Sequence, residues 1–246
     1  MDGLDIRTAA GVLRLTLDRP DRLNAMTAAM SDGLAAELEG AATRDDVRVV
    51  LVAGAGGAFS SGADVSGPDA HEGFDVTSLD RANRIIRAVT GLDKPVVAAV
   101  DGVAAGVGCS TALACDLVVA SPRASFLLAF ARIGLMPDGG ATATVAASVG
   151  RARAMRMALL GEALGARAAY DAGLVSHLTG EHDFTATVEG LLVRLAAGPP
   201  LSYAATKKAV NAATLAHLHD ALERERTGAG IGRGHTPGDG RADGLR

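Results

Sequence analysis

Aromatic residues are scarce in this sequence: they make up 3% of its 246 residues, and tryptophan is absent. Hydrophobic residues still account for 48% and charged residues for 21%. This is enough apolar material for the core of one large domain, alone or with a small appendage. That core must be built mostly from alanine, valine and leucine.

Positive charge is also limited. Lysine occurs only at Lys94, Lys207 and Lys208, and the formal net charge of −4 argues against a broad nucleic-acid surface. The sequence lacks a run of about 18 apolar residues that would span a membrane. It also lacks the basic segment and apolar stretch of a signal peptide at its start. We therefore expect a soluble, cytoplasmic protein with no membrane or nucleic-acid partner.

The cysteines, Cys109 and Cys115, are too few for a disulfide framework and do not have the CxxC spacing. Both lie in a stretch of small apolar residues, so we predict two buried free thiols. No metal site is predicted.

Apolar spacing predicts alternating strands and helices. Residues 13–17 alternate between leucine and polar residues, as in a half-buried strand, and 27–42 has the spacing of an amphipathic helix. Unbroken apolar runs, typical of strands buried on both faces, occur at 47–52, 96–100 and 117–120. This alternation predicts an α/β fold. No period of 20 to 50 residues repeats visibly.

The C-terminal part has a different character. From about residue 143 to 225 the pattern is helical, with alanine, leucine and arginine dominating. The glycine-rich end at 228–246 lacks an apolar stripe and is predicted to be disordered.

Two glycine-rich segments carry residues that packing alone does not require. GGAFSSGADVSG at 56–67 follows a buried strand, and Gly62 lets the backbone approach a ligand. DGVAAGVGCS at 101–110 leads from a strand into a helix, whose first N–H groups can bind developing negative charge. An ordinary turn and a tightly packed helix are the structural alternatives.

A third segment, FARIGLMPDGG at 130–140, places an acid in a restricted turn. Pro137 limits the backbone, and Asp138 stands at the mouth of a Gly-Gly loop. At such a position an aspartate serves either as a turn or helix-cap residue or as an acid or base.

Two other motif interpretations fit less well. GAGGAF at 54–59 begins like a dinucleotide fingerprint, but Phe59 occupies the third glycine position. AFSSG at 58–62 resembles a GxSxG nucleophile elbow with alanine at the first glycine position. A serine hydrolase would also need a histidine, and none of the six histidines has a recognisable context.

Taken together and in this order, the segments resemble the crotonase (enoyl-CoA hydratase/isomerase) superfamily over about residues 5–225. The resemblance is carried by five stretches: DRPDRLNAM (18–26), AFSSGADV (58–65), DGVAAGVGCSTALACD (101–116), ARIGLMPDGGAT (131–142) and AAYDAGLVSHL (168–178). It implies an α/β spiral of repeated ββα units followed by helices that mediate trimer formation.

The implied organisation has three parts. Residues 1–195 would form the α/β core with the acyl-CoA site, 196–227 a helical oligomerisation region, and 228–246 the disordered tail. We expect a homotrimer or a dimer of trimers. The family's final helix, with its F-x-E-K-R-x-P-x-F ending, is missing after Arg226.

Family reactions share an enolate-like thioester anion held by two backbone N–H groups. The matching positions are Ala63 and Val107, and Val107 replaces the family's middle glycine. Because only a backbone donor is needed, valine can serve there, although its side chain narrows the space.

The acids are where the sequence departs from family hydratases. The two hydratase glutamates correspond to Ser110 and Phe130, neither of which can act as a base. Asp138 falls where family isomerases carry a single proton-shuttling carboxylate. In an apolar pocket desolvation would raise its pKa, which suits a group that takes and gives a proton.

The resemblance also implies an acyl-CoA substrate and no separate cofactor, because coenzyme A is part of that substrate. The positions that match its channel are Arg22, Ala25, Ser61, Asp64 and Val65, with Phe130 as an apolar wall. For Arg22 a solvated surface charge is an equal alternative. The sequence thus favours an enoyl-CoA double-bond isomerase. Hydration, thioester hydrolysis, ring opening and non-catalytic acyl-CoA binding remain as alternatives.

Overall fold

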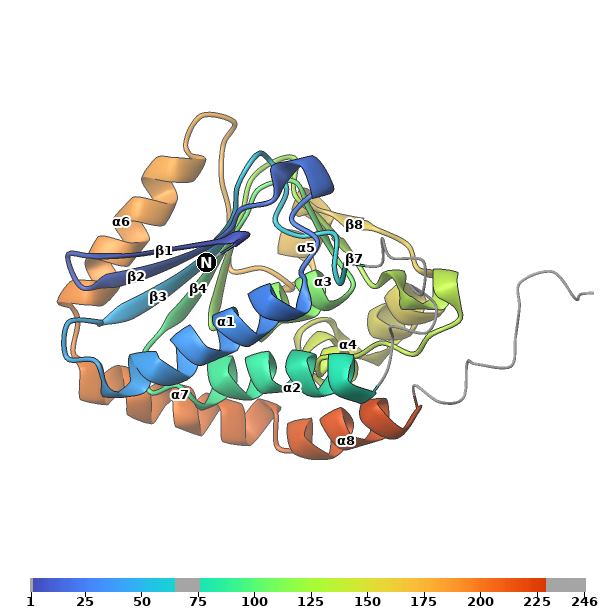
Figure 1. Ribbon diagram of the computed structural model, residues 1–246. Helices are drawn as coiled ribbons and strands as arrows, with labels where there is room; N and C mark the ends of the chain where they lie inside the picture. The colour runs from blue at the N-terminus through green and yellow to red at the C-terminus, as the bar shows by residue number, and fades with distance from the viewer. Residues whose placement is uncertain (1, 65–75, 229–246) are drawn as a thin grey trace, which may run out of the picture.

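A computed structural model describes residues 2–64 and 76–228, which form two β-sheets surrounded by helices (Figure 1). The six-stranded sheet has the order β1-β2-β3-β4-β6-β9, and the three-stranded sheet has the order β5-β7-β8. The strands are β1 Leu4–Ala9, β2 Val12–Leu17, β3 Val49–Gly54, β4 Val96–Val100, β5 Val103–Ala105, β6 Leu117–Ala120, β7 Ser125–Leu127, β8 Leu164–Gly165 and β9 His177–Leu178. In the large sheet β1 is antiparallel to β2, and the other pairs are parallel.

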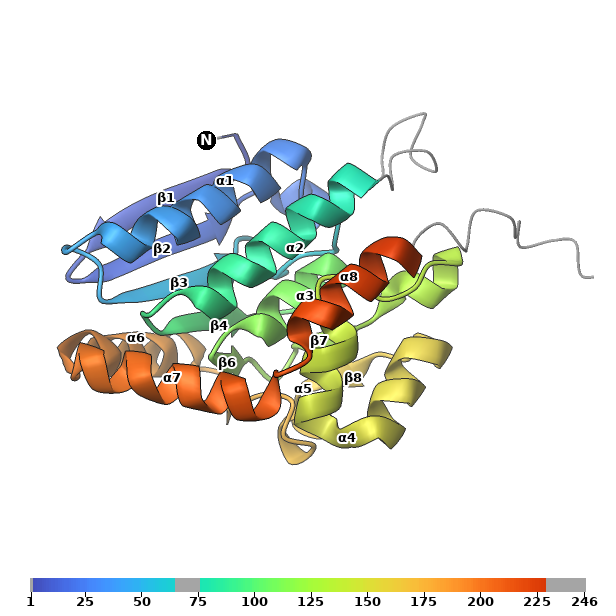
Figure 2. The same cartoon turned by 90° about the horizontal axis from the view of Figure 1, so that it is seen from below.

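Helices cover the large sheet on both sides. They are α1 Ala28–Gly40, α2 Val76–Gly91, α3 Val107–Ala114, α4 Ala141–Leu160, α5 Ala166–Asp171, α6 Phe184–Ala197, α7 Pro200–Thr214 and α8 Leu218–Gly228, with 3₁₀ turns η1 Pro20–Arg22, η2 Ala41–Thr43 and η3 Ala129–Ile133. Helices α1, α2 and α3 lie on one side of the sheet and α6 on the other (Figures 1 and 2).

The central strands are apolar throughout because both of their faces are covered. Val50 and Val52 of β3 pack in the larger core with α1 and α2. Their neighbours Val49 and Leu51 pack in a second core that includes Leu192 of α6. Successive side chains of a strand point to opposite faces of the sheet. A strand between two helical layers therefore buries every residue, which explains the unbroken apolar runs in the sequence.

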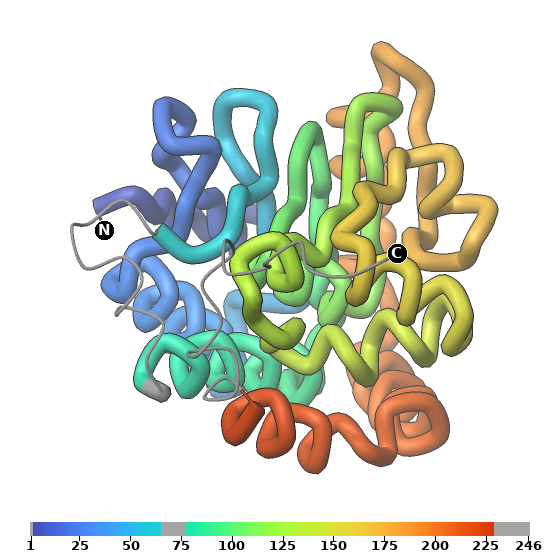
Figure 3. The backbone as a smooth tube through the Cα atoms, turned by 90° about the vertical axis from the view of Figure 1, so that its right-hand side faces the viewer, coloured from blue at the N-terminus to red at the C-terminus, as the bar shows by residue number. Residues whose placement is uncertain are grey.

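The chain passes repeatedly from the large sheet to the small one. β4 continues into β5 and then α3, and β6 continues into β7, which pairs with β5 in parallel. After β3, Ser60 forms a parallel bridge with Ala104, so the first turn of this spiral also reaches the small sheet. The tube in Figure 3 shows these successive loops side by side. The repeat is one of backbone path, which is why no repeat is visible in the sequence.

Most expected elements are confirmed. Strands at 96–100 and 117–120 have the predicted bounds, and the helix expected at 27–42 is α1, which Thr27 caps by accepting a hydrogen bond from Met30 N at 3.2 Å. The strand expected at 47–52 runs over Val49–Gly54 instead, two residues later. The structure also confirms the two buried free thiols, Cys109 and Cys115.

The predicted boundary between residues 195 and 196 falls in the last turn of α6, and α7 and α8 follow it. Of the predicted tail, residues 229–246 lie outside the described residues, whereas Gly228 ends α8. Within the described chain, every helix is too short or too polar to cross a bilayer.

A partly buried ion pair fastens α7 to the sheet: the side chain of Lys207 is 8% exposed and that of Asp116 is 21% exposed. The ammonium group of Lys207 donates to Asp116 at 2.8 Å and to the carbonyl of Val89 at 2.7 Å. The Asp116 carboxylate also accepts the N–H of Val96, the first residue of β4, at 2.7 Å. Burial raises the pKa of Asp116, and the charge of Lys207 opposes that rise.

We predict that Lys207→Met lowers the free energy of unfolding by about 1–3 kcal/mol, because it leaves the partly buried Asp116 carboxylate without its counter-charge. Lys208→Met on the same helix is the matched control. Lys208 pairs with Asp93 at 2.8 Å in an exposed position, so its loss is expected to cost at most about 1 kcal/mol. Urea unfolding measures both, and equal effects would contradict the structural role given to Lys207.

Candidate active site

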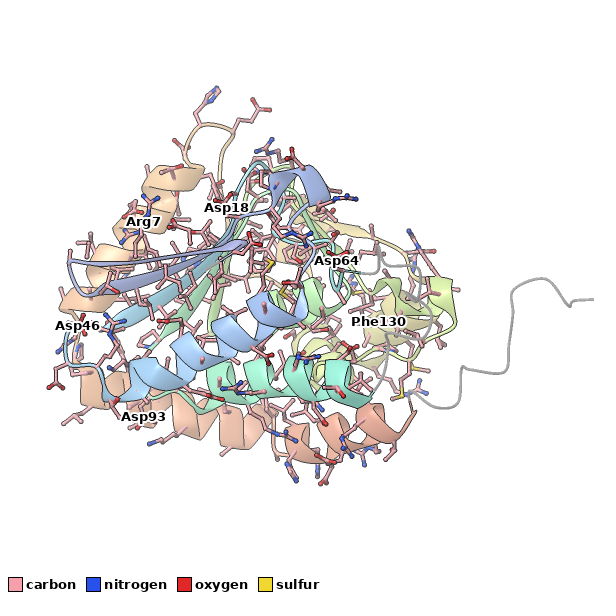
Figure 4. The ribbon with its side chains drawn as sticks, viewed as in Figure 1. Arg7, Asp18, Asp46, Asp64, Asp93 and Phe130 are labelled. Atoms are coloured by element: carbon pink, nitrogen blue, oxygen red, sulfur yellow. The ribbon has the colours of Figure 1, made fainter. Side chains whose placement is uncertain are left out.

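The three glycine-rich segments converge on one small pocket. Its volume is about 100 Å³, and it is lined by Ser61, Gly62, Ala63, Gly106, Val107, Ala129, Phe130, Ile133 and Asp138. Residues from three distant parts of the sequence therefore share one surface, as the resemblance implied. Figure 4 labels two residues of this region, Asp64 beside the pocket and Phe130 in its wall.

Ala63 presents its backbone N–H to this region. Ala63 bridges to Met26 in parallel, with Met26 N donating to Gly62 O at 2.8 Å and Asp64 N donating to Met26 O at 3.0 Å. In a parallel bridge this pattern leaves the N–H of the central residue facing away from its partner. Gly62 has φ +105°, and a Cβ on it would lie 3.1 Å from Ala105 O, so the close approach requires glycine.

Val107 presents the second N–H. It is the first residue of α3, after Gly106 with φ 52°. The first N–H groups of a helix have no acceptor within it and lie at the positive end of its dipole. Val107 itself is buried, so its side chain takes space beside its own N–H.

Asn24 ties the loop before α1 to the segment that carries Ala63. Its side-chain amide donates to the carbonyls of Ala55 and Ala58 at 2.8 and 2.7 Å and accepts from Arg19 N at 2.8 Å. Arg19 in turn bonds Asp64 at 2.8 Å. Both residues lie in the DRPDRLNAM motif, but sequence analysis assigned neither of them a role, because their contacts are made across the fold.

Asp138 is a carboxyl group almost without polar surroundings. It is 5% exposed, and within the described part of the chain its Oδ1 has no hydrogen-bond partner. Burial raises its pKa to about 7, and the charge of Glu225 adds to this rise. The raised pKa predicted for this acid is therefore accounted for first by desolvation. Asp138 does not cap α4, so the helix-cap alternative is wrong.

A side chain of α3 holds the turn that carries Asp138. Ser110 Oγ of α3 donates to the backbone carbonyl of Asp138 at 2.8 Å. Gly139 and Gly140 both have positive φ, +62° and +72°, and a Cβ on Gly139 would lie 2.9 Å from Ser110 Cβ. The hydratase-type glutamate position therefore holds a small side chain that packs against this turn.

Glu225 of α8 holds the same turn at its C-terminal end, where α4 begins. This buried carboxylate accepts from Gly140 N at 2.7 Å, from Thr142 N at 3.1 Å and from Thr142 Oγ1 at 2.6 Å. It thereby caps α4 from a helix distant in sequence. The sequence LERERTG around it reads as a solvated face, so no local pattern pointed to this residue.

The residues predicted for the coenzyme A channel have mixed surroundings. Arg22 is exposed, and Ser61 Oγ donates to the Arg22 carbonyl at 3.3 Å beside the pocket. The Ala25 carbonyl accepts from Arg19, which also pairs with Asp64. Val65 lies outside the described residues. Of the described members of this set, Ser61 lines the pocket; the role of the set in binding coenzyme A stays a prediction.

The nucleophile-elbow and dinucleotide interpretations are not supported. Ser60, the residue at the elbow position, is buried and donates to Asn24 O at 2.9 Å while accepting from Gly62 N at 3.1 Å. Its hydroxyl is therefore occupied by the loop. Segment 54–59 leads into isolated bridges rather than into a helix N-terminus, so the phosphate site of a dinucleotide fold is missing there.

The pocket combines two backbone donors, an apolar wall and one proton-accepting group. Such an arrangement can hold a developing oxyanion and move a proton nearby. Across residues 2–64 and 76–228, groups of three or more histidine, cysteine or acidic side chains that could hold a metal are absent.

The buried Asp138 predicts a pH-dependent stability. Below pH 3.8 the carboxyl is protonated in both states; between 3.8 and about 7 only the folded state keeps the proton, so stability falls as pH rises. Asp138→Asn should thus stabilise the protein by up to about 4 kcal/mol at pH 8 and hardly at pH 4. Thermal unfolding at both pH values measures this, and a gain that does not depend on pH would contradict the assignment.

Comparison with known proteins identifies the family. A sequence profile described as enoyl-CoA hydratase/isomerase matches residues 7–229. The chain is 42% identical over 204 residues to a probable enoyl-CoA hydratase of Rhodobacter capsulatus, covering 82% of this chain and 78% of that protein. It is 37% identical over 223 residues to 1,2-epoxyphenylacetyl-CoA isomerase of Escherichia coli, covering 88% and 84%.

The fold agrees. The crystal structure of an enoyl-CoA hydratase from Mycobacterium avium subsp. paratuberculosis superposes with a TM-score of 0.88 at 48% identity, covering 95% of this chain and 91% of that one. With the ββα spiral and the convergent glycine-rich segments, these matches show that the chain belongs to the enoyl-CoA hydratase/isomerase family and has the crotonase fold.

Proposed function

We propose that this acyl-CoA enzyme is an enoyl-CoA double-bond isomerase with Asp138 as its proton shuttle. The observation that carries the proposal is the buried Asp138 carboxyl, which has a pKa of about 7 and shares a pocket with Ala63 and Val107. A general base works best when its pKa lies near the operating pH.

In the proposed reaction the thioester carbonyl oxygen accepts hydrogen bonds from Ala63 N and Val107 N. The Asp138 carboxylate removes a proton from the carbon next to the carbonyl, and the negative charge passes to that oxygen. The protonated Asp138 then returns the proton to the far carbon of the former double bond. The double bond moves by one position, and no atom is gained or lost.

The surroundings of the acid favour isomerisation over hydration. Hydration needs a water molecule held by acid and base groups, but Ser110 is already bonded to the Asp138 carbonyl and Phe130 is an apolar wall. Both hydratases and isomerases occur among the similar proteins, so the proposal rests on these residues of the present chain. Ile133, which lines the pocket and is 55% exposed, offers an apolar surface to an acyl group.

The substrate assay is direct. The purified protein is incubated with 2-enoyl-CoA and 3-enoyl-CoA thioesters, and the products are identified by mass spectrometry and NMR. Interconversion of the two without a mass change supports the isomerase. A product heavier by one water would favour a hydratase, and binding without turnover would favour an acyl-CoA-binding protein. Coenzyme A binding by Arg22 and its neighbours, the trimer and the cytoplasmic location remain predictions.

We predict that Asp138→Asn lowers the isomerisation rate by about 10²–10⁴-fold, the usual contribution of a general acid–base group. Acyl-CoA affinity should stay within a few-fold, because the amide has the same shape. Stopped assays and isothermal titration measure the two quantities. A variant with nearly wild-type turnover would remove Asp138 from the mechanism.

The oxyanion assignment is tested at Val107. Val107→Pro deletes the N–H at the first position of α3, where proline is tolerated, and should cut turnover by about 10²-fold or more. Val107→Gly is the matched control: it keeps the N–H, enlarges the pocket and should improve the relative rate with branched acyl groups. Circular dichroism checks folding. Wild-type turnover in a folded Val107→Pro protein would eliminate this donor.

A further inference from the structure

We propose that Glu225 of α8 is a positioning residue for Asp138: it clamps the turn that carries Asp138 and places its own negative charge near this acid. The proposal deepens the proposed isomerase function and rests on it for its catalytic meaning. Three independent features support it, namely hydrogen bonding, the docking of α8 and the local arrangement of charge.

The hydrogen bonds place Glu225 at the start of α4, two residues after Asp138. One carboxylate oxygen accepts from Gly140 N, and the other accepts from Thr142 N and Thr142 Oγ1. Gly140 itself provides no side-chain cap. The free N–H groups at this helix end are therefore satisfied by a residue 85 positions away in sequence.

Helix α8 is held firmly enough to define this position. Leu218 and Leu222 are buried in the main core, and a Cβ on Gly140 would lie only 2.7 Å from Leu218 Cδ1. Two ion pairs to α2 flank Glu225 in sequence: Glu223 with Arg87 at 2.8 Å and Arg226 with Asp80 at 2.7 Å. Helix α8 thus has an apolar anchor and two polar ones, and it lies beside α2 (Figure 2).

Arg224 has a charge that acts on Glu225, whereas the charged side chains of the neighbouring α2 and η3 have partners elsewhere. Arg87, Asp80, Glu223 and Arg226 are already paired between α2 and α8. The first turns of α4, residues 141–149, contain no charged residue. The guanidinium of Arg132 in η3 donates to Gly161 O at 2.7 Å, and Arg81 and Arg84 of α2 pair with residues of α1.

Hydrogen-bond donors favour the ionised form of Glu225. Burial raises its pKa, but the hydrogen bonds from Thr142 and Gly140 and the charge of Arg224 act in the opposite direction. Within the described residues Asp138 Oδ1 has no such donor, and the negative charge of Glu225 adds to burial in raising the pKa of Asp138 to about 7. We therefore expect the two carboxyls to titrate as a coupled pair.

Glu225→Gln tests the charge directly. Removing the negative charge lowers the cost of ionising Asp138, so the pKa of Asp138 should fall by about one unit. The ¹³C signal of the Asp138 side-chain carboxyl, assigned by its absence in Asp138→Asn, reports this pKa without any turnover. The acidic limb of kcat/KM should move to lower pH by the same amount.

Two further variants separate charge from clamping. Glu223→Gln removes the same charge from an exposed ion pair at a neighbouring position of α8. It should leave the Asp138 titration unchanged. Glu225→Asp keeps the charge but shortens the reach to the α4 N-terminus; it should lower the melting temperature while leaving the Asp138 midpoint near that of the wild type. A merely structural role predicts the same midpoint in Glu225→Asp and Glu225→Gln.

An unchanged Asp138 midpoint in Glu225→Gln, or an equal shift in Glu223→Gln, would overturn the proposal. If Glu225→Gln does not fold, the test is made on the wild-type protein. If the two carboxyls are coupled, the Asp138 signal shifts over the pH range in which Glu225 titrates as well as over the range in which Asp138 itself titrates. A single independent step for each carboxyl would also overturn it. These titrations need no substrate, so they stand apart from a failure to isomerise enoyl-CoA thioesters.

Discussion

Ser110 and Glu225 hold the turn at residues 137–140 from two sides, and the arrangement of the pocket depends on this clamp. Ser110 fixes the backbone carbonyl of Asp138, while Glu225 satisfies the N–H groups where α4 begins. The Asp138 side chain does not cap α4; it lies buried in the pocket, where its Oδ1 has no hydrogen-bond partner among the described residues. An orphaned buried carboxyl is costly, so such a group persists only where the surrounding structure determines it.

Favourable contacts elsewhere in the fold offset the free-energy cost of burying the Asp138 carboxyl. Covering the central strands on both faces buries nearly every residue of β3 and β4, and the Lys207–Asp116 pair fastens α7 to the edge where β4 begins. These contacts lie outside the pocket, but they hold the sheet and helices from which the pocket loops extend. The site combines one desolvated acid, Asp138, with polar groups nearby whose hydrogen bonds are satisfied. The side-chain amide of Asn24 is the clearest example.

The difference between reaction types in this family comes down, in this chain, to a few side chains on a common frame. In the proposed mechanism the two backbone donors need only the correct path of the chain, so Val107 can stand in a glycine position. Ser110 and Phe130 stand at the two hydratase-type acid positions, and Asp138 is the ionisable group among the residues that line the pocket; this is the basis of the proposed isomerisation. A single carboxyl with a pKa near 7 suits a proton transfer between two carbons of one substrate better than the activation of water.

The sequence by itself determined the α/β class, the main strands and the two buried thiols, because these depend on local periodicity and on runs of small apolar residues, whereas the meeting of the three glycine-rich segments at one pocket was implied only by the family resemblance. The ββα repeat was not visible in the sequence, because the repeat is a backbone path that different side chains can follow. The roles of Asn24, Arg19 and Glu225 were decided only by the tertiary structure, since their partners lie on other elements. Glu225 shows the reason most clearly: its sequence neighbourhood is that of an exposed helix, and only the docking of α8 on α2 and α4 buries it beside the turn of Asp138.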